Sequence, residues 1–428
     1  MLPSAETIQI ILPVLAVLFL LLSLFNPVYG VVSYFIVLNA KLGDMYPALG
    51  QVRFELLVAL FVLLRIFVEV QGLERLLPGK NPINRAYLAM FLAGMISVVF
   101  SIDPAISWEF GGYNLLRVTV FYVMVVATIK TRSDLSKILW AFVLVTAWIA
   151  YEPVSNYLSG EVLSQLYGGV AYGRFGQATG HVALANTLNQ AIPITLYFGL
   201  ASRKGYLKAL SAAVLVLLVF GVYASKSRGG LVGLVLICLG VLYLARAKLK
   251  ATVMVGSMLL VLVGFSASDY LTHMATIKEG IFASRSSSDR YIGLLNGLSM
   301  MQKRPVTGVG IGCYPEARAR YFHYRFYSHN LYGELIGELG LASIAWFYWM
   351  YVVLKRARKL KQGLDPLDPG DLFYINVISA IQLGLVVRLI IGNLTHGSLF
   401  WFWYMMAALT VGVQNVLLSE DRIHAERV

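Results

Sequence analysis

IQIILPVLAVLFLLLSLF, at residues Ile8–Phe25, is an apolar run long enough to cross most of a bilayer. Similar runs recur at Ser211–Val222 and Val253–Gly264, and 58% of the residues are hydrophobic while only 13% are charged. Because a helix needs roughly 20 apolar residues to cross a hydrocarbon core about 30 Å thick, the sequence predicts an all-α polytopic membrane protein. The stretches between the runs are too short for a large soluble domain, so residues 1–428 are expected to form a single integral membrane domain.

Thirteen apolar segments are candidates for transmembrane helices. They lie near residues 7–25, 28–46, 54–74, 86–101, 113–129, 135–151, 187–201, 206–223, 229–245, 251–266, 330–354, 372–391 and 398–418. The second segment is interrupted by Asn39 and Lys41, so about 12 helices are expected, with boundary errors of about 2–4 residues. The two halves of the chain show no self-similarity of the kind found in many transporters.

Basic residues predict how these helices are oriented. They cluster in four short loops, near residues 130–137, 203–208, 246–250 and 355–361. Short cytoplasmic loops are rich in Lys and Arg, and an even number of predicted helices separates each pair of these loops, so all four are placed in the cytoplasm. The opposite, extracytoplasmic side then carries the segments 152–186, 223–230, 267–329 and 392–397. The segment 267–329 is predicted to be a large, partly helical loop on that side.

The formal net charge of +13 follows from the same loops. In a soluble protein this charge would suggest nucleic acid as a partner, but none is predicted here. The two cysteines, Cys238 and Cys313, lie in an apolar run and in the polar loop, which indicates neither a disulfide framework nor a metal cluster. The start of the chain, MLPSAETIQI, lacks a basic region and a small-residue cleavage site, so the first apolar run is expected to be a retained helix.

The polar interval Ser284–Gly340 contains the residues best suited to chemistry. Its arginines lie among tyrosines and glycines, at Arg285, Arg290, Arg304, Arg318, Arg320 and Arg325. Fixed cations beside one titratable imidazole, His329, suggest chemistry on an anionic, lipid-attached substrate, with the imidazole removing a proton from a sugar hydroxyl. The alternative is that His329 and Asn330 only cap the next helix, while Gly333 and Gly337 allow close helix packing.

Arg228 and Arg290 each have two interpretations. Arg228 lies in SRGG, where a guanidinium can bind phosphate and the glycines let a ligand approach the backbone, but an interfacial arginine can also simply anchor a helix. Arg290 precedes an amphipathic helix predicted over Tyr291–Met301, and a helix N-terminus beside an arginine attracts anions. Alternatively, the charges of Asp289 and Arg290 are merely solvated.

Two further stretches are less specific. The interval Tyr314–Tyr327 alternates arginines with aromatic residues, which could hold phosphates and stack on sugars or could anchor the loop at the bilayer surface. The segment YGRFGQATGHVALAN places Arg174 and His181 among glycines, which suggests a backbone close to a ligand or to a helix. The sequence contains no nucleotide-binding glycine loop and no external metal-ligand spacing, so arginines would have to stabilise a leaving diphosphate.

Three elements together resemble the O-antigen ligase and polymerase family of bacterial membrane glycosyltransferases. They are SRGG at Ser227–Gly230, RPVTGVGIGCY at Arg304–Tyr314 and SHNLYGELIGELG at Ser328–Gly340. The resemblance covers residues 170–345 by motif and the flanking helices by topology only. It implies a membrane glycosyltransferase fold with an extracytoplasmic site. It also implies transfer of a glycan from undecaprenyl diphosphate to an acceptor hydroxyl, which in O-antigen ligases belongs to the lipid A–core of lipopolysaccharide.

The resemblance also implies roles for single residues. The family's loop histidine falls on His329 and its arginines fall on Arg228 and Arg290, which become the predicted catalytic residues. The predicted substrate-binding residues are Arg174, Arg285, Arg318, Arg320, Arg325 and Asn330. No cofactor or metal ion is expected. The expected partners are the lipid-linked donor, the lipid A–core and the bilayer, and the expected location is the bacterial inner membrane with the active site facing the periplasm.

Other functions fit the same residues. An O-antigen polymerase or a ligase that glycosylates proteins shares the same motifs, so the acceptor is open. A transporter of lipid-linked glycan is the alternative from a different class of protein. Its basic residues would line a path to the cytoplasmic face, whereas an enzyme would gather them on the external side only.

Overall fold

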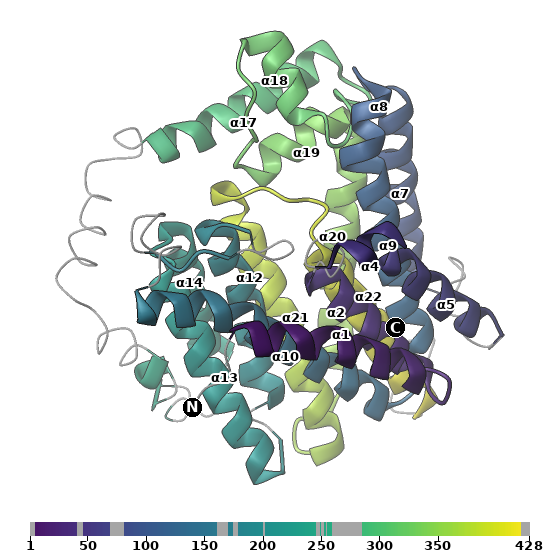
Figure 1. Ribbon diagram of the computed structural model, residues 1–428, viewed down its shortest axis with the longest axis vertical. Coiled ribbons are helices and arrows are strands. Elements are labelled where there is room, and N and C mark those ends of the chain that lie inside the picture. Colours follow the sequence, from purple (N-terminus) through teal and green to yellow (C-terminus); the bar gives the residue numbers. More distant parts are fainter. Residues whose placement is uncertain are drawn as a thin grey trace.

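The computed structural model shows a bundle of helices (Figure 1). It describes residues 5–40, 46–68, 81–160, 170–173, 179–199, 202–244, 249, 252–253, 255–258 and 285–420. Within these ranges every regular element is a helix, and the one β-bridge joins Gly173 to Gly180. The described part of the chain therefore has the all-α character that its apolar runs predict.

The helices follow the predicted apolar segments closely. The first half of the chain contains α1 (Ala5–Leu22), α2 (Pro27–Ala40), α4 (Pro47–Gln51), α5 (Phe54–Val68), α7 (Pro82–Val99), α8 (Pro104–Ser107), the π-helix η2 (Trp108–Gly112), α9 (Tyr113–Thr128) and α10 (Arg132–Ser159). The second half contains α12 (His181–Ile194), the π-helix η4 (Thr195–Gly199), α13 (Gly205–Ala224), α14 (Arg228–Leu244), α17 (Arg285–Lys303), α18 (Tyr314–Phe322), α19 (Leu331–Leu339), the 3₁₀ helix η6 (Gly340–Ala342), α20 (Ser343–Gln362), α21 (Pro369–Ile391), the 3₁₀ helix η7 (Gly392–Leu394) and α22 (Trp401–Ser419). The predicted segment near 251–266 lies mostly outside the described residues.

Seven of the described helices are long and apolar enough to cross a membrane. They are Pro82–Val99, Pro104–Thr128, Arg132–Ser159, Gly205–Ala224, Leu331–Gln362, Pro369–Leu394 and Trp401–Ser419. Shorter apolar helices cover Pro13–Leu22, Pro27–Asn39 and Arg228–Leu244. The predicted span in α12 belongs to neither group, and this helix buries the polar side chains of Asn186, Asn189 and Gln190. The chain is a multi-pass membrane protein, but the described residues do not reach 12 spans.

Three of the four basic loops, near residues 130–137, 203–208 and 355–361, meet at one end of the bundle, and most of the fourth, near 246–250, lies outside the described residues. The guanidinium of Arg132, at the start of α10, lies 4.2 Å from the centre of the Phe373 ring on α21. Phe373 in turn packs against Phe198 of η4, with 5.9 Å between ring centroids. Lys361, at the end of α20, donates a hydrogen bond of 2.7 Å to the Ser379 hydroxyl. These loops therefore share one end, as their charge predicts, and the face of the membrane that this end occupies stays a prediction.

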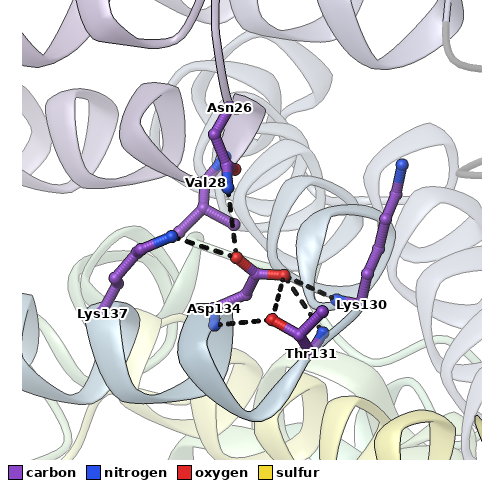
Figure 2. A network of polar contacts seen from close by, with 6 residues as sticks. All are labelled: Asn26, Val28, Lys130, Thr131, Asp134 and Lys137. Carbon is purple, nitrogen blue, oxygen red and sulfur yellow. Dashed lines mark hydrogen bonds and ion pairs between the residues drawn. The ribbon is translucent and has the colours of Figure 1, made fainter.

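A buried carboxylate ties the N-terminal helices to α10 (Figure 2). Asp134 accepts hydrogen bonds from the Asn26 amide at 3.2 Å, from the Thr131 hydroxyl at 2.9 Å and from the Lys137 ammonium at 3.3 Å. The Thr131 hydroxyl accepts a bond from the Asp134 backbone N–H at 3.2 Å, which completes a capping box at the start of α10. Because Asn26 lies between α1 and α2, the network fixes that turn against α10.

Helices α17, α18 and α19 form a cap at the other end, at the top of Figure 1. Glycines let α17 and α19 approach each other closely. A Cβ atom added to Gly333 would lie 2.5 Å from the carbonyl oxygen of Gly293, and one added to Gly337 would lie 3.1 Å from the Cα of Gly297. The close-packing role predicted as an alternative for Gly333 and Gly337 is therefore confirmed.

The GVGIG segment of the RPVTGVGIGCY motif, Gly308–Gly312, connects the cap to the bundle. The N–H groups of Val309 and Gly310 donate to the carbonyl oxygens of Gly337 and Glu338 at 2.9 and 3.0 Å. Gly310 has a φ of +108°, a conformation open to glycine but not to most other residues. The motif is thus a structural element that supports the end of α19.

The segment predicted as a single span over 330–354 is two helices. Gly340, with a φ of +59°, ends α19, and the 3₁₀ turn η6 leads into α20. The N–H of Leu341 donates to the carbonyl oxygen of Pro305 at 2.7 Å, which fixes the break against the cap. The consequence is a short helix, α19, whose N-terminus presents His329 at the junction between the cap and the bundle.

Candidate functional site

His329 directly precedes the N-cap of α19 and has an unusual backbone conformation. Its φ is +50°, in the left-handed region that non-glycine residues seldom adopt. Its half-buried imidazole lies 4.9 Å from the ring of Phe326 and 5.0 Å from the ring of His396, between centroids, with edge-to-face geometry in both contacts. Such backbone strain persists only where the surroundings hold it, and it is enriched at functional sites.

The environment of His329 favours its neutral form. Burial lowers the pKa of His329 from its ordinary value of 6.5, and the charges of Arg290 and Arg318 lower the pKa further, while Asp289 opposes them. An imidazole that is neutral at pH 7 can accept a proton. His329 is thus in the protonation state that a general base needs.

Arg290 and Arg228 face the same region from two other helices. The Nε of Arg290, on α17, donates to the carbonyl oxygen of Leu394 at 3.0 Å. Burial lowers the pKa of Arg290, and the charge of Arg228, at the start of α14, lowers that pKa further. Two guanidiniums close enough to repel each other are suited to binding an anion between them. Gly229, next to Arg228, also lies against Leu394, because a Cβ atom added there would be 3.6 Å from the Leu394 Cβ. The structure thus brings Arg228 and Arg290 to the segment that leads to His396, whose ring contacts that of His329. Their catalytic roles stay predictions.

A cavity of about 1120 Å³ opens beside His329 and is called here the His329 cavity. Aromatic rings supply much of its wall, from Phe110, Tyr172, Phe326, Tyr327, Phe400 and Trp401. Its polar groups include the carboxylates of Glu316, Glu334 and Glu338 and the imidazoles of His181, His329 and His396. Small-molecule sites commonly measure about 300–1,000 Å³, so this cavity accommodates a ligand at or above that size.

The predicted substrate-binding arginines differ in where they lie. Arg325 lines the His329 cavity and forms an ion pair with Glu316 at 3.6 Å. Arg320 is exposed on α18 and does not line the cavity. Arg174 lies outside the described residues. Arg285 is the first residue of α17, and its side chain also lies outside them.

Arg318 is fully buried and binds protein groups. Its Nη1 donates to the carbonyl oxygen of Tyr327 at 2.8 Å, and its Nη2 donates to the Tyr324 hydroxyl. Its guanidinium also lies 4.3 Å from the centre of the Tyr324 ring. These contacts stabilise the turn that precedes His329, so in this structure Arg318 supports the backbone of the site.

Asn330 is the N-cap of α19. Its side-chain oxygen accepts hydrogen bonds of 3.0 Å from the N–H groups of Tyr332 and Gly333, and its side-chain nitrogen donates to the carbonyl oxygen of Asn393 at 3.3 Å. The capping role, which the sequence offered as an alternative, is confirmed. Its fixed amide holds the start of α19 against the segment that follows α21, and so positions His329.

Three polar residues beside His329 were missed by sequence reasoning: Glu338, Arg388 and His396. Glu338 follows Glu334 by one helical turn, and both carboxylates line the cavity. That i, i+4 spacing is a signal that could have found Glu338. Arg388 and His396 come from α21 and the loop after η7, and no local spacing connects either of them to His329.

Metal ligands and thiols are the other kinds of group that could react at this end. Within the ranges that the structure describes, no group of three or more His, Cys, Asp or Glu side chains is arranged to hold a metal ion. Cys313 is buried, and burial raises the pKa of its thiol to about 12, so it stays protonated and unreactive. The groups available for chemistry at the cavity are therefore imidazoles, carboxylates and guanidiniums.

A comparison with known families agrees with this geometry. Residues 213–348 match the family model described as O-Antigen ligase. This region contains Arg228, Arg290 and His329, together with the three motifs that carry the resemblance. No curated protein matches the chain. Over residues 213–348 the chain is therefore similar to the O-antigen ligase family, the family that its three motifs resemble.

Proposed function

We propose that this protein is an O-antigen ligase-like glycosyltransferase of the bacterial inner membrane. It moves a glycan from undecaprenyl diphosphate to a hydroxyl of lipid A–core, on the periplasmic side, without a metal ion and with inversion at the anomeric carbon. The observation that carries the proposal is that the segments of Arg228, Arg290 and His329 converge on the stretch Leu394–His396. Arg290 binds the carbonyl oxygen of Leu394, a Cβ atom at Gly229 would lie 3.6 Å from the Cβ of Leu394, and the ring of His329 packs against that of His396. His329 also lines the large cavity, whereas Arg228 and Arg290 are not among its lining residues.

In this proposal Arg228 and Arg290 bind the diphosphate of the donor. Negative charge grows on the diphosphate as its bond to the sugar breaks, so the two guanidiniums stabilise the transition state more than the bound substrate. Burial is the main cause of the lowered pKa of Arg290, and the charge of Arg228 lowers that pKa further. An anion bound between the two arginines would relieve this repulsion, which supports the role. The bond from Arg290 to Leu394 fixes the direction of one guanidinium before the substrate arrives.

His329 acts as the general base. Its neutral imidazole takes the proton of the acceptor hydroxyl, and the hydroxyl oxygen forms a bond to the anomeric carbon from the side opposite the diphosphate. The bond between that carbon and the diphosphate oxygen breaks, and its electron pair leaves with the diphosphate. The lowered pKa of His329 supports this step, since a cationic imidazole could not accept the proton.

The His329 cavity holds the acceptor sugar. Aromatic walls offer apolar faces to sugar rings, and the carboxylates of Glu316, Glu334 and Glu338 can accept hydrogen bonds from hydroxyl groups. Arg325, which is 61% exposed at the rim, is placed to contact phosphate groups of a lipid A–core.

The test uses purified protein in detergent with an undecaprenyl diphosphate-linked oligosaccharide and lipid A–core, without nucleotide and with a chelator. The expected result is a shift of the acceptor in electrophoresis that disappears in His329→Ala and Arg228→Ala. Arg358→Ala, an exposed arginine at the basic end, and His323→Asn, an exposed histidine outside the cavity, are matched controls that should keep activity.

The other outcomes separate the alternatives. Growth of the donor into longer chains without an acceptor would identify a polymerase. Reaction only when a protein acceptor is supplied would identify a protein-glycosylating ligase. Binding of the donor without reaction on any acceptor, together with movement of the donor across a vesicle membrane, would identify a transporter and overturn the proposal.

A further inference from the structure

His396 lies in the short loop between η7 and α22 and packs against the predicted base. The centroids of the His396 and His329 rings are 5.0 Å apart, and the rings meet at 75°. On another side, the ring of Tyr327 stacks on His396 at 5.2 Å and 12°. His396 is therefore held in contact with two neighbours that both belong to the cap, although it comes from the C-terminal part of the chain.

Two buried polar side chains, Glu334 and Arg388, fix the backbone on both sides of His396. The Glu334 carboxylate accepts hydrogen bonds from the N–H groups of Gly397 at 2.7 Å and Ser398 at 3.1 Å. The Arg388 guanidinium donates to the carbonyl oxygen of His396 at 3.3 Å. A buried polar group is costly unless it is hydrogen-bonded, so the bonds from Glu334 and Arg388 hold this short loop firmly.

The turn after His396 requires a glycine at position 397. Its φ is +111°, and a Cβ atom at this position would lie 2.6 Å from the Phe400 ring. Its carbonyl oxygen also accepts a hydrogen bond of 3.0 Å from the indole of Trp403. The fold therefore sets the direction of the His396 side chain before any substrate binds.

The imidazole of His396 is neutral and incompletely satisfied. Burial lowers the pKa of His396 to about 3, with smaller contributions from His329 and Arg388. Its buried Nδ1 atom has no hydrogen-bond partner in the part of the chain that the structure describes. Because a group with such a pKa does not gain a proton at physiological pH, the His396 ring contributes packing against His329 and Tyr327 and does not itself supply a titrating base.

We propose that His396 is a positioning residue for His329: the Glu334 and Arg388 contacts hold its neutral ring against the imidazole of His329 and keep that imidazole directed at the acceptor hydroxyl. The inference rests on the proposed function, since it assumes that His329 is the base. The charged and titratable groups that face the two imidazoles are Asp289 and Arg290 on α17, Arg318 on α18, Tyr327 before α19, Glu334 on α19 and Arg388 on α21.

The test compares His396→Leu with His396→Gln and His396→Asn in the purified full-length protein, using the donor and acceptor pair that reacts. His396→Leu should lower kcat about 100-fold, because a misdirected base costs roughly that much, while the KM for the donor stays unchanged. At least one amide variant should restore most of the turnover, because a neutral, planar polar side chain of similar length can pack against His329 in the same place. The acid limb of the pH–rate profile should remain in place in all three.

Two results would overturn the inference. One is wild-type kcat in His396→Leu. The other is an equal loss in all three variants with normal folding and donor KM, which would mean that His396 itself transfers the proton. Thermal unfolding of each variant separates a lost fold from a misplaced base. If His329→Ala is fully active, the proposed function fails; if His329→Ala is inactive and His396→Leu is normal, only the positioning role fails.

Discussion

The two ends of the helical bundle both carry basic residues, but in different physical states. At the end where the basic loops meet, side chains are exposed to water, as for Arg203, Lys204, Arg358 and Lys359. At the cap end, Arg318 is fully buried, and Arg290 and His329 are half-buried. Exposed cations keep their hydration and contribute about 0–1 kcal/mol per ion pair, whereas buried cations need a partner or a ligand to replace water.

This difference assigns two roles: the exposed cations favour one orientation in the membrane, and the buried ones serve the chemistry of the site. Exposed Lys and Arg in short loops favour one orientation in the membrane through their number, so a single one is replaceable. Buried cations act through their geometry, so each one matters. If burial distinguishes the two ends, substitutions at the cap end should change turnover or stability strongly, and substitutions at the basic end should change them little.

The first prediction concerns the arginine pair. Arg228→Gln or Arg290→Gln should lower kcat about 10²–10³-fold, the usual cost of removing one donor to a developing anion. The KM for the donor should change less, because the interaction strengthens in the transition state. Steady-state kinetics with varied donor measures both. A raised KM with an unchanged kcat would show that the arginines only hold the ground state.

The second prediction concerns pH. The pKa of His329 is lowered, so the base is neutral above that pKa and activity is lost as pH falls through it, below about 6.5. Because the charge of Arg290 helps to lower this pKa, Arg290→Gln should move the acid limb of its residual activity to higher pH. A log kcat profile between pH 4 and 8 checks the sign, and a limb that moves to lower pH would contradict it.

The third prediction concerns the packing of the cap. Gly333→Ala places a Cβ 2.5 Å from the carbonyl oxygen of Gly293, so α17 and α19 must separate. The expected destabilisation is about 1–3 kcal/mol, as for other overpacked sites. Thermal unfolding in detergent measures it, with Gly205→Ala as the control because a Cβ at Gly205 meets nothing within 4 Å. Equal unfolding temperatures for the two variants would contradict the packing account.

The smallest effect is expected at the basic end. Arg358→Gln and Lys359→Gln should leave turnover unchanged and alter stability by no more than about 0.5 kcal/mol, as is usual for exposed positions. The same kinetic assay provides the measurement. A loss of turnover like that of Arg290→Gln would abolish the distinction between the two ends.

Sequence reasoning worked where a short motif carries the information. The apolar runs predicted most helices. Arg228, Arg290 and His329 were selected from motifs and come from segments that converge on Leu394–His396, and their catalytic roles stay predictions. The break at Gly340 was missed, because hydropathy averaged over a window does not register one residue with a positive φ.

The remainder of the site depends on tertiary contacts that the amino-acid sequence does not show directly. Arg318 and Asn330 have side chains that could bind a substrate, but the fold uses their hydrogen bonds for a turn and for a helix cap. His396 contacts His329, and Arg388 contacts the backbone of His396, through tertiary packing between segments that are distant from His329 in the sequence.

The most direct test of the central claim, that His329 is the base, is the turnover of His329→Gly with and without added imidazole. Glycine accepts the φ of +50° at this position, so the variant removes the ring with little backbone strain. The account predicts that kcat falls about 10²–10⁴-fold, that donor binding is retained, and that added imidazole restores part of the rate. Near-normal turnover of His329→Gly without imidazole would contradict it.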